Sequence, residues 1–200
     1  MNAPEIPDFA LSVVLGIGLA AATGFRVFLP ILIMSGGPGH LQLDNSFAWL
    51  ATPSALTMLG VATVTETLVY YVPGVDNLLD ALATPAAFVA GTVVSAAVIT
   101  DLPPMVKWTA AVIAGGGIAG ITQGVTAILR AKSTILTGGL GNSVIATAEL
   151  AGSLLVSLLT LVAPLVALAL VVLFLWLTMH LVRHWRRGAR LHEDTRRSKQ

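Results

Sequence analysis

The stretch Gly24-Phe-Arg-Val-Phe-Leu-Pro30 places a glycine, an arginine and a proline close together in an otherwise apolar run. Glycine and proline both interrupt helices, so the stretch predicts a broken or re-entrant helix rather than a continuous one. Arginine keeps its charge even where water is scarce, so Arg26 needs a permanent partner. A carboxylate of the protein and an anionic group of a substrate are both suitable partners.

The composition around this stretch indicates a membrane protein. Apolar residues make up 56% of the 200 residues and charged residues 10%, against about 25% charged in ordinary soluble domains. The absence of cysteine excludes disulfides and thiol chemistry. We therefore expect an all-α, polytopic membrane protein with about six apolar helical segments: 9–35, 49–72, 84–100, 104–130, 143–163 and 165–183.

The charge distribution predicts the orientation. Seven of the eleven Lys and Arg residues lie in the last eighteen positions, next to an apolar segment. By the positive-inside rule this end is cytoplasmic, and six spans place the N-terminus there too. We expect a transmembrane domain over 1–185 in a bacterial inner membrane and a basic tail over 186–200. The tail is expected to attract anionic lipid rather than nucleic acid.

Small residues recur every four positions in the first and fourth segments, one hundred residues apart. Such faces allow close helix packing in lipid and are compatible with a 3+3 inverted repeat, as in many transporters. The glycines of 114–117 predict that the fourth helix is also broken or re-entrant. The packing residues are Gly16, Ala20 and Gly24, and Gly116, Gly120 and Gly124.

Two glutamates are candidates for a substrate or proton pathway, because an ionised carboxylate in lipid must face protein, water or a cation. Glu66 lies before Pro73, with Tyr70 one turn later on the same helix face. Glu149 begins a polar stripe that continues with Ser153 and Ser157. Two interpretations stay open for each: structural contacts between helices, or the lining of a wet pathway.

Pro73, Asp76 and Asp80 are interpreted as a structural turn. Asp76 suits the N-cap of a short amphipathic helix lying on the membrane. Asp76 and Asp80 are also four residues apart, a spacing at which two carboxylates can hold Mg²⁺ against a diphosphate. We predict no metal site and no cofactor, because a second acidic motif is missing.

Leu19-Ala-Ala-Ala-Thr-Gly-Phe-Arg-Val-Phe-Leu-Pro30, together with Glu66, Pro73-Gly-Val-Asp-Asn-Leu-Leu-Asp80 and Thr84-Pro85, resembles a bacterial integral-membrane family. That family is known as domain of unknown function four-one-two-six. The resemblance implies that Arg26, Glu66, Asp76, Asp80 and Glu149 match recurrent motif positions. The family carries no assigned activity, so the resemblance supports the architecture and leaves the function open.

These observations lead to three functional hypotheses. The first is a small transporter or channel, expected to be a homodimer, for a small or lipid-linked anionic solute. In it Arg26 binds the anion and a glutamate carries a coupling proton. The second is a membrane scaffold or assembly factor whose charges only hold helices together. The third is a membrane-embedded Mg²⁺-dependent enzyme acting on a diphosphate lipid; no enzyme activity is assigned.

Overall fold

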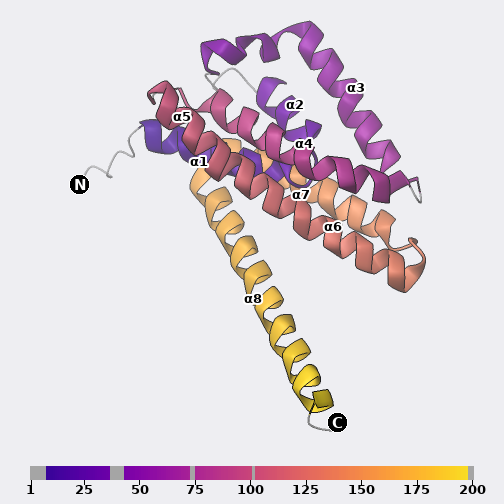
Figure 1. The fold of residues 1–200 in the computed structure, drawn as a ribbon. Helices are drawn as coiled ribbons and strands as arrows, with labels where there is room; N and C mark the ends of the chain where they lie inside the picture. The colour runs from indigo at the N-terminus through magenta and orange to yellow at the C-terminus, as the bar shows by residue number, and fades with distance from the viewer. Residues whose placement is uncertain (1–7, 37–42, 73–74, 101, 198–200) are drawn as a thin grey trace. The chain divides into compact units, whose positions relative to one another are not determined.

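The computed structural model describes residues 8–36, 43–72, 75–100 and 102–197, and the side chains of residues 8, 76–78 and 181–197 lie outside the description. Every regular element in the described part is a helix (Figure 1). The elements are α1 (Asp8–Thr23), α2 (Phe28–Gly36), η1 (Asn45–Ala51), α3 (Pro53–Val69), α4 (Val75–Val98), α5 (Pro104–Ala110), η2 (Ala111–Gly116), α6 (Gly117–Thr137), α7 (Asn142–Val162) and α8 (Pro164–Arg197).

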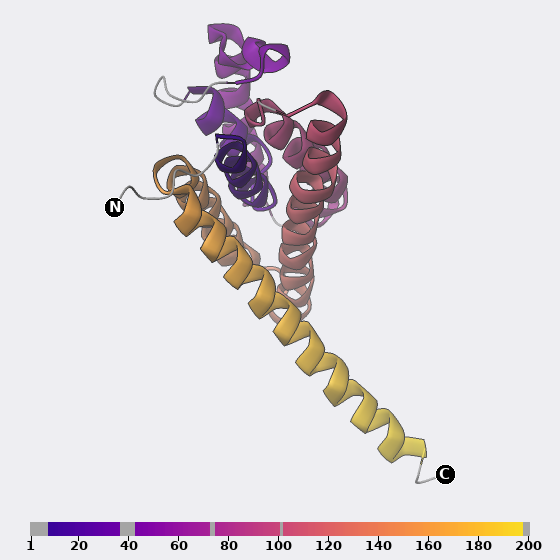
Figure 2. The ribbon, with the colours of Figure 1, turned by 90° about the vertical axis from the view of Figure 1, so that its left-hand side faces the viewer.

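Residues 1–168 form one compact unit and residues 169–200 form a second, which continues α8. Inside the first unit, α1 packs against α4, α6 and α7, and α2 packs against α3 (Figures 1 and 2). The residues of α1 from Leu19 to Ala22 are almost completely buried, so α1 forms the centre of the unit. The boundary expected after residue 185 falls inside α8 and stays a prediction.

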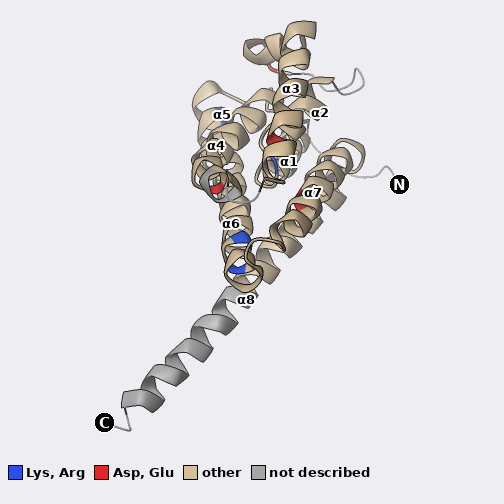
Figure 3. Cartoon of the chain, turned by 90° about the vertical axis from the view of Figure 1, so that its right-hand side faces the viewer, with Lys and Arg blue, Asp and Glu red and all other residues tan. Residues whose placement is uncertain are grey.

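Three described helices are long and apolar enough to cross a membrane: Leu79–Val98, Pro104–Thr137 and Asn142–Val162. A fourth span is added if η1 and α3, which are bent by 68° at Thr52, are counted together. Charged residues are sparse among these helices, as Figure 3 shows. The chain is therefore a membrane-embedded helical protein.

The break expected in the first segment is present. Helix α1 ends at Thr23, α2 begins at Phe28, and the amide of Gly24 still donates to the carbonyls of Ala20 and Ala21. A Cβ atom on Gly24 would lie 2.6 Å from the carbonyl oxygen of Ala119 on α6. The glycine thus lets the end of α1 approach α6, and the chain turns away immediately afterwards.

The break expected in the fourth segment is wrong. Residues Pro104–Thr137 form one continuous helical span, and Ala111–Gly116 adopt a π-helical turn within it. The glycines here serve close packing instead, because a Cβ atom on Gly115 would lie 2.7 Å from the carbonyl oxygen of Gly91 on α4. A local insertion into a helix widens one turn without breaking the helix.

The interpretation of Pro73, Asp76 and Asp80 as a structural turn also needs correction. Helix α4 begins at Val75 and continues through Pro85, so Asp76 is its second residue and Asp80 lies in its second turn. Among the described residues, no separate amphipathic helix precedes the span that begins at Leu79. Pro73 and the side chain of Asp76 lie outside the described residues.

Candidate functional site

Arg26 lies in the break between α1 and α2, and its side chain is 1% exposed. Its Nη2 donates a hydrogen bond of 2.8 Å to the carbonyl oxygen of Ala146 on α7. The same nitrogen lies 3.7 Å from Oε2 of Glu149, one helical turn further on. Of the two partners open from the sequence, the structure thus provides a carboxylate of the protein.

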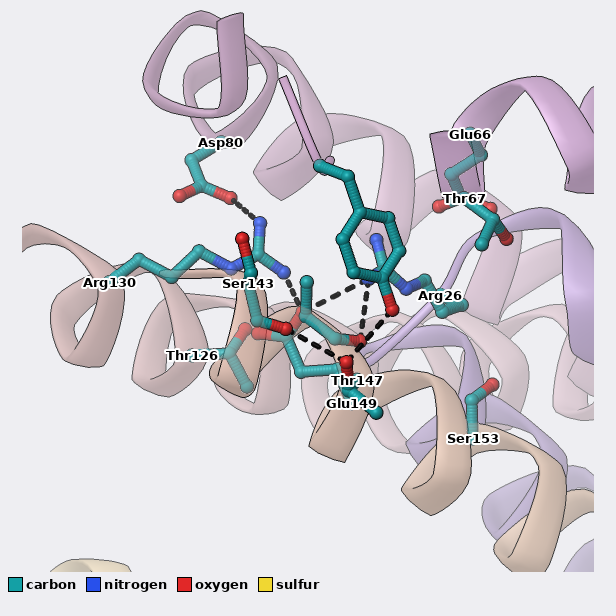
Figure 4. Close-up of polar contacts among 12 residues, drawn as sticks. Arg26, Glu66, Thr67, Asp80, Thr126, Arg130, Ser143, Thr147, Glu149 and Ser153 are labelled. Carbon is teal, nitrogen blue, oxygen red and sulfur yellow. Dashed lines mark hydrogen bonds and ion pairs between the residues drawn. The ribbon is translucent and has the colours of Figure 1, made fainter. Parts of the chain in front are cut away.

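A second buried arginine, Arg130, approaches the same carboxylate from α6. Its Nη1 lies 2.8 Å from Oδ1 of Asp80 on α4, and its Nη2 forms an ion pair with Glu149. Figure 4 shows Arg26 and Arg130 approaching from two sides, with Glu149 between them. We define Arg26, Asp80, Arg130 and Glu149 as the charge cluster.

Sequence reasoning missed Arg130, the last residue of the apolar segment expected over 104–130. It missed Asp80 as well, which was assigned to a turn. A signal existed on α6, where Thr122, Thr126 and Arg130 are spaced by four residues and are all buried. Polar residues on a buried helix face indicate polar partners on the neighbouring helices.

Tyr70, at the C-terminal end of α3, contacts both arginines. The guanidinium carbon of Arg26 lies 4.1 Å from the centre of the Tyr70 ring, and that of Arg130 lies 3.9 Å from it. An aromatic face attracts cations at this distance. Tyr70 is 4% exposed, so its ring covers the charge cluster on the side of α3.

The charge cluster holds two positive and two negative side chains away from water. Burying such charges costs several kcal/mol per ion unless pairing is very good. Several polar atoms of the cluster have no hydrogen-bond partner among the described residues: Arg26 Nε and Nη1, Arg130 Nε and Glu149 Oε1. The arginines therefore retain hydrogen-bonding capacity beyond the contacts made within the cluster.

Glu66, on α3, lies against the start of α2. Its carboxylate accepts hydrogen bonds from the amides of Val27, at 2.8 Å, and Phe28, at 3.1 Å. These are the first free amides of α2, which form a favourable position for a negative charge. Glu66 thus caps α2, a partner that its sequence context did not reveal.

A pocket of about 580 Å³ lies between α3 and α4. Its wall comprises residues of α3, residues of α4, and Val27 and Phe28 at the start of α2; it is largely apolar. Glu66 and Tyr70 both line it. The pocket therefore reaches the cap of α2 and the aromatic ring that covers the charge cluster.

The polar stripe of α7 packs against α1. Ser153 and Ser157 are fully buried, and Ser153 Oγ donates to the carbonyl oxygen of Ala22 at 3.1 Å. Ser157 Oγ has no hydrogen-bond partner among the described residues. The contact of Ser153 corresponds to the structural interpretation; a pathway role for the stripe stays a prediction.

The packing glycines divide into two groups. Gly16 faces Ser95 of α4, Ala20 is fully buried, Gly24 faces α6, and Gly116 faces Phe88 and Thr92 of α4. By contrast, Gly120 has only ordinary contacts, and nothing lies within 4 Å of a Cβ atom on Gly124. Within one chain, close approach to α4 is made by Gly115 and Gly116, and a packing role for Gly124 stays a prediction.

These features define a helical membrane protein with a buried charge cluster beside an apolar pocket. The chain belongs to the family described as a domain of unknown function, DUF4126, which it matches over residues 13–184. No curated protein and no solved structure matches the chain. Among the described residues, no group of three or more acidic or histidine side chains is arranged to hold a metal ion.

Proposed function

We propose that the protein is a small membrane transporter or channel for a small or lipid-linked anionic solute, coupled to a proton. One observation carries this proposal: the pocket reaches Glu66 and Tyr70, directly beside two buried arginines. A largely apolar pocket with a few polar groups at one end is typical of ligand sites. Arg26 and Arg130 retain guanidinium nitrogens without a hydrogen-bond partner among the described residues, and these nitrogens can donate to an anion.

In the proposed mechanism Glu66 carries the proton. When ionised, Glu66 holds the amides of Val27 and Phe28 and so fixes the start of α2. Protonation removes the negative charge, weakens this cap and frees α2 to move relative to α3. Because Arg26 lies between α1 and α2, movement of α2 changes the access of an anion to Arg26.

The topology proposed with this function has six spans. Helices α1 and α2 together form the first, η1 with α3 the second, and α8 the last, with both termini in the cytoplasm of a bacterial inner membrane. A 3+3 inverted repeat and a homodimer belong to the same proposal. The tail over 186–200 binds anionic lipid; its side chains lie outside the described residues.

The test is proton flux in proteoliposomes loaded with a pH-sensitive dye. Inorganic phosphate, succinate and palmitoyl lysophosphatidic acid are supplied outside, one at a time. We expect one of these anions to acidify the interior of proteoliposomes that contain the wild type or the control variant Glu193→Gln, whose substitution lies in the tail over 186–200. We expect none of them to do so with Glu66→Gln. Full flux in folded Glu66→Gln would contradict the proton mechanism; no flux with any anion in the wild type would contradict transport.

The scaffold hypothesis is the second candidate, and the hydrogen bond from Arg26 to the backbone of Ala146 favours it. If the charges only hold helices together, substitution of Arg26 lowers stability and flux is absent throughout. The Mg²⁺-enzyme hypothesis ranks third, because Asp80 is paired with Arg130 rather than available to a metal ion.

A further inference from the structure

We infer that the pocket between α3 and α4 binds the acyl chain of a single-chain anionic lipid, whose head group reaches the arginines when the Tyr70 side chain turns aside. This inference rests on the proposed function and specifies its substrate class. It concerns three parts of the molecule: the pocket wall, the Tyr70 ring and the free nitrogens of the two arginines.

The position of the pocket favours a molecule that arrives from the membrane. Met58 and Val61 on α3 and Leu82 on α4 line the pocket and are 74%, 64% and 62% exposed. The helices that bear them are apolar, and α4 is a membrane span. The outer side of the pocket is therefore formed by exposed apolar side chains, a surface that suits a hydrocarbon chain.

The inner side of the pocket has a different chemistry. Tyr70 lines the pocket, and both guanidinium groups lie within 4.1 Å of its ring centre. Arg26 is 1% exposed, and its Nε and Nη1 have no hydrogen-bond partner among the described residues. Buried N–H donors normally have a hydrogen-bond acceptor, and a phosphate or carboxylate accepts several hydrogen bonds at once.

The Tyr70 ring is what separates the two regions. Tyr70 is the C-cap residue of α3, so its side chain lies at a helix end and not in a helix interior. Turning the ring exchanges two cation–π contacts for contacts between the arginines and the anionic head group. The head group offsets the lost contacts by accepting hydrogen bonds from the guanidinium nitrogens that have no partner among the described residues, and hydrogen bonds between charged groups are stronger than cation–π contacts.

Glu66 makes this binding depend on protons. Its carboxylate lines the pocket and would repel an anionic head group when ionised. Thermodynamic linkage then requires that the anion bind more tightly when Glu66 is protonated, and that the bound anion favour protonation. The lipid and the proton are thus taken up together, as coupled transport requires.

Equilibrium binding to the full chain in detergent tests the inference, with palmitoyl lysophosphatidic acid as the probe. Monopalmitoyl glycerol keeps the chain and lacks the charge, and inorganic phosphate keeps the charge and lacks the chain. We expect the lysophosphatidic acid to bind about tenfold or more tightly than the glyceride. We expect phosphate alone not to compete at equal concentration. Equal binding of the lipid and the glyceride would overturn the role of the arginines.

Two variants of the same type locate the site. Ala86→Phe fills the pocket wall on α4, whereas Ala81→Phe places the same ring on the same helix at an exposed position outside the pocket. We expect Ala86→Phe to weaken binding about tenfold or more and Ala81→Phe to leave it unchanged. If Ala86→Phe does not fold, Ala62→Phe on α3 serves instead. Unchanged binding in the folded pocket variant would refute the inference.

The outcomes separate this inference from the proposed function. Flux of phosphate or succinate, together with lysophosphatidic acid binding that Ala86→Phe does not weaken, would leave transport intact and remove the lipid site. Binding of the lysophosphatidic acid that depends on Ala86, without flux of any anion, would leave the lipid site intact and remove transport.

Discussion

The substitution Glu149→Gln tests the charge cluster most sharply, because one carboxylate there contacts two arginines. Glu149 is 4% exposed at its side chain, and Arg26 and Arg130 are each 1% exposed. The amide keeps the shape and removes the negative charge, so Asp80 alone remains to balance two buried cations. Removing one partner from a buried ion pair costs about 3–5 kcal/mol.

That cost corresponds to a melting temperature lower by about 6–20 °C for a chain of this size. The melt can be followed in detergent by the fluorescence of the four tryptophans. Ser153→Ala is the matched control, since Ser153 lies one turn further on the same buried face of α7 and donates one neutral hydrogen bond. Its loss should cost about 1 kcal/mol, or about 2–4 °C.

A double-variant cycle adds a second criterion. Arg130→Gln combined with Glu149→Gln should destabilise by less than the two single changes added together, since each removes the charge that the other needs. Equal shifts for Glu149→Gln and Ser153→Ala, or additive effects in the cycle, would refute the charge cluster.

Two further predictions concern packing and pH. Gly24→Ala should destabilise the protein by about 1–3 kcal/mol, because the added methyl group meets Thr122 and the α6 backbone. Gly124→Ala has open space around the new methyl group, so it should be neutral or stabilising by up to about 1 kcal/mol. Equal shifts of the two variants in thermal melts would contradict this prediction. The hydrogen bond from Lys107, followed by that from the Ser46 amide, lowers the pKa of Asp44. The resulting stability is therefore present above the ordinary Asp pKa of about 3.9 and is lost as the pH falls through the lowered value. The melting temperature of Lys107→Met should accordingly lie below that of the wild type at neutral pH, and the difference should shrink in acid. A difference in melting temperature that does not depend on pH would contradict this prediction.

The helical class and the break at Arg26 could be predicted from the sequence because both depend on local properties. Hydropathy defines apolar helices, and the closely spaced glycine, arginine and proline interrupt one. The division expected between the segments 143–163 and 165–183 is also present, since α7 ends at Val162 and α8 begins at Pro164. The need of Arg26 for a partner followed from its charge alone, and the structure shows Glu149, one of the two glutamates singled out in the sequence, beside it.

The contacts of Arg130 and Asp80 could not be predicted because they depend on how α4 and α6 are aligned. Arg130 follows an apolar run and precedes Lys132, so its local context is that of a helix end. Asp80 follows Pro73-Gly74, a context typical of a turn. Only the packing of α4 against α6 brings the two side chains together at 2.8 Å. The contact of Glu66 with the amides of Val27 and Phe28 could not be predicted either, because it depends on the position of α2 relative to α3.

The proposed function requires that the buried arginines and the pocket form one binding site for an anion. A structure of the protein in lipid nanodiscs with palmitoyl lysophosphatidic acid tests it most directly. We predict density for the head group within hydrogen-bonding distance of Arg26 or Arg130, with the Tyr70 ring displaced and the chain lying between α3 and α4. An unoccupied pocket at saturating lipid, with Tyr70 still covering both arginines, would contradict a shared binding site.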